Sequence, residues 1–130
     1  MIGIVIVGHG GLARELLAAM EHVVGPQPAA SAVSTGPEDD LSAKQAEIAA
    51  AVAAANHGAG VALVTDMFGG TPCNLSIGCM GDDVQVIYGA NLPLLVKLAK
   101  MRDKPLEEAT NAALEAGRKY IDSAAAMLTA

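Results

Sequence analysis

The chain has 130 residues, a length that fits one domain with a buried core of its own. Slightly over half of the residues are apolar but only three are aromatic, so aliphatic side chains must build the core. The net charge of −6 argues against nucleic acid as a partner, because phosphate contacts need clustered lysine and arginine. No stretch approaches the ~20 apolar residues of a membrane span, and the N-terminal residues lack the pattern of a signal peptide. We therefore expect a cytoplasmic protein.

The first half of the chain alternates between strand and helix patterns. A continuous apolar run predicts a buried strand over residues 2–7, and apolar positions at helical spacing predict a helix over residues 11–24. A strand of weaker propensity is predicted over residues 29–34. Next, Glu38-Asp39-Asp40 is expected to place acidic side chains in the first turn of an alanine-rich helix that runs to about Asn56.

The second half continues the alternation. It predicts two strands, over residues 61–65 and 84–88, and three helices, over residues 72–79, 92–101 and from 106 to about 124. Thr71 is expected to be an N-cap followed by Pro72 at the first helical position, and Pro105 to occupy the first position of the last helix. The tail, residues 125–130, fits either a helix end or a short extra strand.

Alternating strands and helices predict a single α/β domain over residues 1–130. Right-handed crossovers would give a doubly wound, mainly parallel four-stranded sheet with helices on both faces. In such sheets, ligands bind beyond the carboxyl ends of the strands. Four polar residues directly follow predicted strands and are expected at this edge: His9, Thr35, Asp66 and Asn91.

His9 and Asp66 are the candidate catalytic residues. A histidine can gain and lose a proton, or accept a phosphoryl group, near neutral pH. A carboxylate that binds Nδ1 of the ring leaves Nε2 as a directed nucleophile. His22 and His57 have no comparable partner and are expected to be structural.

A glycine-rich segment between Asp66 and Pro72 is the candidate phosphate-binding loop. Backbone amides of Gly69 and Gly70, together with the Thr71 hydroxyl, could converge on an anion near His9. Gly10 is expected to expose a further amide. The segment lacks the Gly-Lys-Ser/Thr of a Walker loop, so we expect a transient phosphoryl group and no bound nucleotide or other cofactor. No cluster has metal-ligand spacing, and Cys73 and Cys79 are expected to be free thiols.

Three sequence blocks resemble the IIA component of the mannose family of the bacterial phosphotransferase system. They are Gly8-His9-Gly10, the block Asp66-Met67-Phe68-Gly69-Gly70-Thr71-Pro72-Cys73-Asn74, and Gly89-Ala90-Asn91-Leu92-Pro93. The resemblance implies that His9 takes a phosphoryl group from the phosphocarrier HPr and passes it to a IIB component. It also implies that Asp66 hydrogen-bonds the active histidine and that the Thr71 hydroxyl lies beside the phosphate.

The resemblance also implies a homodimer and protein partners at the site. Phe68, Asn91, Leu92 and Pro93 are the expected partner-contact residues. Since the chain stops at Ala130, we expect IIB to be a separate polypeptide and the membrane to be involved only through a sugar permease. The family's exchangeable fifth strand would have to come from residues after about 122, where the match is poor.

Other functions remain as alternatives. Phosphorylation of His9 could gate binding to a regulatory target without onward transfer. A receiver-like domain is rejected, because acidic residues would then follow the first strand. A flavodoxin-like binding module is weak, because only Phe68 and Tyr88 could stack on a flavin.

Overall fold

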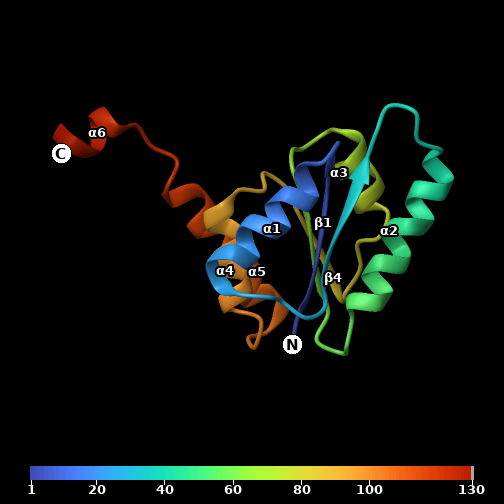
Figure 1. Ribbon diagram of the computed structural model, residues 1–130. Helices are drawn as coiled ribbons and strands as arrows, with labels where there is room; N and C mark the ends of the chain where they lie inside the picture. The colour runs from blue at the N-terminus through green and yellow to red at the C-terminus, as the bar shows by residue number, and fades with distance from the viewer. Residues whose placement is uncertain (130) are drawn as a thin grey trace.

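A computed structural model describes residues 1–129 and contains one four-stranded parallel sheet (Figure 1). The strand order is β2-β1-β3-β4 and every neighbouring pair is parallel, which confirms the predicted doubly wound α/β fold. The strands are β1 (Gly3–His9), β2 (Ala30–Thr35), β3 (Val61–Thr65) and β4 (Val84–Ile87). The order reverses between β1 and β3, so the ends of these two strands form the topological switch point where open α/β sheets bind ligands.

The two central strands are buried on both faces. Residues 4–7 of β1 and 61–64 of β3 have no exposed surface. This burial explains their continuous apolar sequences, because helices cover both sides of a parallel sheet. β2 has weak strand propensity, yet it forms because each of its residues from Ala30 to Thr35 pairs with β1.

Helices divide the core into two layers (Figure 1). One layer packs α1, α4 and α5 against the even-numbered residues of β1, and the other packs α2 and α3 against the odd-numbered ones. The helices are α1 (Leu12–Val24), α2 (Leu41–Ala55), α3 (Thr71–Ile77), α4 (Leu92–Lys100), α5 (Leu106–Lys119) and α6 (Ala124–Thr129). No helix within residues 1–129 combines the length and the apolar character needed to cross a bilayer.

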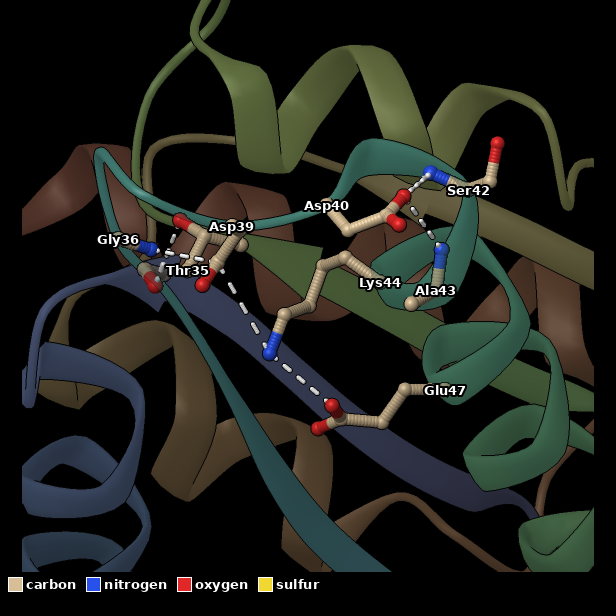
Figure 2. Close-up of polar contacts among 9 residues, drawn as sticks. Thr35, Gly36, Asp39, Asp40, Ser42, Ala43, Lys44 and Glu47 are labelled. Carbon is tan, nitrogen blue, oxygen red and sulfur yellow. Dashed lines mark hydrogen bonds and ion pairs between the residues drawn. The ribbon is translucent and has the colours of Figure 1, made fainter.

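Three expected helix starts are wrong by one to three residues. Gly70, not Thr71, is the N-cap of α3, and no side chain caps this helix. Pro105 is likewise the N-cap of α5 instead of its first residue. The acidic segment lies before α2 rather than inside its first turn: Asp40 is the N-cap, and its carboxylate accepts hydrogen bonds from the amides of Ser42 and Ala43 at 3.0 and 3.3 Å (Figure 2). A capping carboxylate satisfies the orphan amides more directly than a first-turn charge does.

The C-terminal segment also differs from the prediction. α5 ends at Lys119, five residues before the expected end, and residues 124–129 form a short helix. The sequence allows either a helix end or an extra strand for this tail, and the structure shows a helix, separate from α5, through residue 129. Figure 1 shows α6 standing away from the body of the domain, and its apolar side chains Met127 and Leu128 are exposed.

A buried arginine lies at the amino-terminal end of β1, opposite to His9. Arg102 is 3% exposed, and its guanidinium donates hydrogen bonds to the carbonyl oxygens of Ile2 and Ala29 and to Oε1 of Gln27, at 2.7, 3.1 and 3.1 Å. Burial lowers the pKa of Arg102, and the neighbouring charge of Asp103 partly offsets that effect. Arg102 therefore joins the start of β1 to the loop before β2.

Candidate active site

His9 and Asp66 meet at the carboxyl edge of the sheet, as the sequence predicts. His9 is the last residue of β1, and Asp66 directly follows β3. The Asp66 Oδ2 atom lies 2.8 Å from Nδ1 of the His9 ring, and the same atom accepts a 2.8 Å hydrogen bond from the His9 backbone amide. An ionised carboxylate only accepts hydrogen bonds, so the Nδ1 atom must carry the proton. The tautomer with an unprotonated Nε2 is therefore favoured.

Asp66 is held as an anion. Its side chain is 8% exposed, and Oδ1 accepts a 2.9 Å hydrogen bond from the Met67 amide. Burial by itself raises the pKa of Asp66, but the hydrogen bonds from the His9 amide, the His9 ring and the Met67 amide outweigh burial and lower it. The His9 side chain is 51% exposed, so the aspartate is fixed in the protein while the ring remains accessible.

The glycine-rich loop passes along the Nε2 edge of the His9 ring. A Cβ atom on Gly70 would lie 2.8 Å from Cε1 and 3.2 Å from Nε2 of His9. Glycine therefore allows the backbone to approach the edge that carries Nε2. Gly69 has a φ of +89°, a left-handed conformation that favours glycine.

Hydrogen-bond donors in this loop remain unused. Within residues 1–129, the backbone amides of Gly69, Gly70 and Thr71 and the Thr71 hydroxyl have no hydrogen-bond acceptor. Thr71 is exposed and no longer needed as a cap, because Gly70 occupies that position. These donors belong to Gly70, which adjoins Nε2, and to the residues on either side of it, and they could bind the oxygens of an anion.

Gly10 is placed differently from the expectation. Its amide donates a 2.8 Å hydrogen bond to the Thr35 carbonyl oxygen, so this amide is not available to a phosphate. Its φ of +54° turns the chain from β1 into α1, and no atom lies within 4 Å of the place where a Cβ would be. Thr35 is buried, and its hydroxyl donates to the Gly8 carbonyl oxygen at 3.2 Å. The β2 end thus fixes the turn after His9.

The expected partner-contact residues differ in their exposure. Phe68 is 65% exposed, and its ring centroid is 4.9 Å from that of Tyr88. Leu92 and Pro93, at the start of α4, are half-buried. Asn91 is the N-cap of α4: its Oδ1 accepts from the Leu94 amide and its Nδ2 donates to the Gly117 carbonyl oxygen, both at 3.0 Å. The polar atoms of Asn91 are therefore engaged within the chain.

The remaining candidate groups lie outside the site. His22 and His57 are exposed at the ends of α1 and α2. Cys73 and Cys79 are both free, as expected, and burial raises the pKa of the Cys79 thiol, which a hydrogen bond from Gln45 partly opposes. Among residues 1–129, no three His, Cys, Asp or Glu side chains are arranged to hold a metal ion.

The chain is similar to known proteins over most of its length. The family described as "PTS system fructose IIA component" matches residues 3–115. The mannose-specific EIIAB component of the phosphotransferase system (PTS) of Escherichia coli K12 is 30% identical over 124 aligned residues. The alignment covers 92% of this chain but 38% of that protein, so the chain spans well under half the length of this relative.

Solved structures share the fold. The mannose/sorbose specific IIA subunit of the Enterococcus faecalis phosphotransferase system has a TM-score of 0.84 and 29% identity, over 94% of this chain and 93% of that chain. The component EIIA of Streptococcus agalactiae has a TM-score of 0.85 over 97% and 99% of the two chains, with 21% identity, which shows the fold alone. The chain therefore belongs to the mannose and fructose family of PTS IIA components.

Proposed function

We propose that this protein is a phosphoryl relay that accepts a phosphoryl group from phospho-HPr on His9 and passes it to a IIB component. The observation that carries the proposal is the 2.8 Å contact between Nδ1 of His9 and Oδ2 of Asp66. This contact directs the lone pair of Nε2 outward, beside a loop with unused donors. Both the family and the arrangement of the site support phosphoryl transfer in sugar uptake.

The proposed reaction is an in-line displacement at phosphorus. Nε2 of His9 forms a bond to phosphorus as the bond from phosphorus to the donor histidine breaks. The ring becomes positively charged when it carries the phosphoryl group, and the Asp66 carboxylate balances that charge. The Thr71 hydroxyl and the amides of Gly69 and Gly70 bind the phosphoryl oxygens. Positioning and charge stabilisation supply most of the catalysis of such transfers.

The half-exposed His9 ring can be reached by a partner protein. We propose that Phe68, Leu92 and Pro93 contact HPr and IIB in turn, each partner placing its own histidine over Nε2. The acidic exterior would attract a basic partner surface, so the transfer rate should fall as salt is added. We further propose that the protein acts in the cytoplasm as a homodimer, which sedimentation of the purified protein would test.

Phosphorylation of His9 is tested with radiolabelled phospho-HPr. We expect wild type to be labelled, and His9→Ala to remain unlabelled. His22→Ala is the matched control, because it removes an exposed histidine from the same region of the chain. Labelling of His9→Ala at the wild-type rate would overturn the assignment.

Onward transfer separates a relay from a regulatory binding module. Labelled wild-type protein is freed of HPr and mixed with a mannose-family IIB protein. A relay loses its label to IIB, and the label appears on IIB in equal amount. Label that stays on His9 with every IIB tested would contradict the relay and favour regulation by phosphorylation alone.

A further inference from the structure

Positive charge is scarce in the part of the chain that holds His9, Asp66 and the glycine-rich loop. Residues 1–91 contain nine Asp and Glu but only two cationic side chains other than histidine, Arg14 and Lys44. A phosphoryl group on a histidine carries close to two negative charges near neutral pH. Phosphorylation of His9 would therefore add negative charge to a region that is already strongly acidic.

Lys44 is committed to neighbouring carboxylates. Its Nζ atom lies 2.9 Å from Oε1 of Glu47 and 3.9 Å from Oδ2 of Asp39, and its side chain is 16% exposed. Figure 2 shows the ammonium group between these two carboxylates in the β2–α2 region. The Asp39 carboxylate in turn accepts a 2.7 Å hydrogen bond from the Gly36 amide. Lys44 therefore stabilises this loop, and its charge is already paired with carboxylates outside the site.

Arg14 is available. It lies in the first turn of α1, five residues after His9, and a Cβ on Gly11 would be 3.3 Å from one of its terminal guanidinium nitrogens. The guanidinium thus lies over the turn that connects His9 to α1. Its ion pair with Glu15 has a 3.7 Å separation, and both side chains are about three-quarters exposed, so this pair contributes little.

The position of Arg14 is unfavourable for the helix itself. The N-terminal end of a helix carries a partial positive charge, so a cation in the first turn is repelled where an acid would be stabilised. Neither the helix nor a strong ion pair therefore accounts for an arginine at this place. A dianionic phosphoryl group on His9 would instead attract the Arg14 cation.

We propose that Arg14 binds the phosphoryl group carried by His9, an inference that rests on the proposed phosphorylation of this residue. The exposed side chain turns across Gly11, and its guanidinium hydrogen-bonds phosphoryl oxygens, a contact for which the planar fork is well suited. Arg14 takes no part in proton transfer. Its effect is to favour the dianionic form of the phosphoryl group and to offset the surrounding acidic charge.

The test is a ³¹P NMR titration of the phosphorylated protein. Wild type, Arg14→Gln and Arg14→Lys are phosphorylated with phospho-HPr or with the small reagent phosphoramidate. Lys104→Gln is the matched control, because it removes the same exposed charge two residues from Arg102, at the opposite edge of the sheet. A cation beside the phosphoryl group lowers its second pKa, which is about 6 in phosphorylated side chains.

We expect Arg14→Gln to raise the phosphoryl pKa by about 0.5 to 1 unit, the size of a unit-charge contact in a largely aqueous setting. Arg14→Lys should recover part of the shift, and Lys104→Gln should titrate as wild type does. Coincident titrations of Arg14→Gln and wild type would overturn the inference while leaving His9 phosphorylation intact. If neither reagent phosphorylates His9, the proposed function itself fails.

Discussion

Replacing Gly70 with alanine would test whether the Nε2 edge of His9 is the reacting edge. The backbone at Gly70 has φ −84° and ψ 173°, an extended conformation open to any residue, so alanine introduces no backbone strain. The new Cβ would instead meet Cε1 of His9 at 2.8 Å. An ordinary contact needs about 3.4 Å, so the ring must move by about 0.6 Å, the difference between the two distances.

That movement acts directly on the contact with Asp66. We expect the retreat of the ring to loosen the 2.8 Å hydrogen bond between Nδ1 and the carboxylate. A hydrogen bond to a charged group contributes about 1.5–3 kcal/mol, and each ~1.4 kcal/mol corresponds to a tenfold change in rate. We therefore expect Gly70→Ala to slow phosphorylation by phospho-HPr by about 10- to 100-fold.

The assay is the initial rate of labelling with radiolabelled phospho-HPr, alongside thermal unfolding. Gly36→Ala is the matched control, because its new Cβ would meet no atom closer than 3.8 Å at the same edge of the sheet. Gly70→Ala should remain folded at the assay temperature, although the loosened hydrogen bond lowers its unfolding temperature by several degrees. A folded Gly70→Ala protein that is labelled at the wild-type rate would refute the reasoning that joins this loop to Nε2.

Three further predictions concern stability. Thr65→Val should raise the free energy of unfolding by about 1 kcal/mol in urea titrations, because the Thr65 hydroxyl is buried and has no partner within residues 1–129. Arg102→Met should lower that free energy by about 3 kcal/mol, since one buried and two half-buried acceptors lose their donor, whereas Lys104→Met should change it little. Because folding lowers the Asp66 pKa below its usual 3.8, the ionised form stabilises the fold above that value and the contribution is lost as pH falls through the folded pKa. The melting-temperature difference between wild type and Asp66→Asn should therefore shrink between pH 5 and pH 2.5, and a difference that is independent of pH would contradict the role of this carboxylate.

Features set by local sequence were largely predictable. The apolar runs of β1 and β3 place His9 and Asp66 at one edge, because parallel strands that end together bring their next residues together. The Gly-Gly pair likewise indicated a close approach of backbone, and Gly70 lies against the His9 ring. Both inferences need only strand direction and the absence of a side chain.

Features set by distant contacts were not predictable. Nothing near Arg102 in the sequence indicates that its guanidinium reaches Ile2, Gln27 and Ala29. The use of the Gly10 amide depends on the neighbouring end of β2, which the sequence of the first turn does not contain. Helix starts were misplaced for a smaller reason: glycine, proline and aspartate all act as N-caps, and their order alone does not decide which one does.

The place of β1 in the sheet has a consequence for biosynthesis. The ribosome makes β1 before its neighbours β2 and β3 and before Arg102, which follow over the next hundred residues. A nascent chain shorter than this leaves the most apolar segment of the protein without its partners, a state that chaperones recognise. His9 is thus translated well before Asp66 and the glycine-rich loop, and the candidate site is assembled only after those later residues have been made.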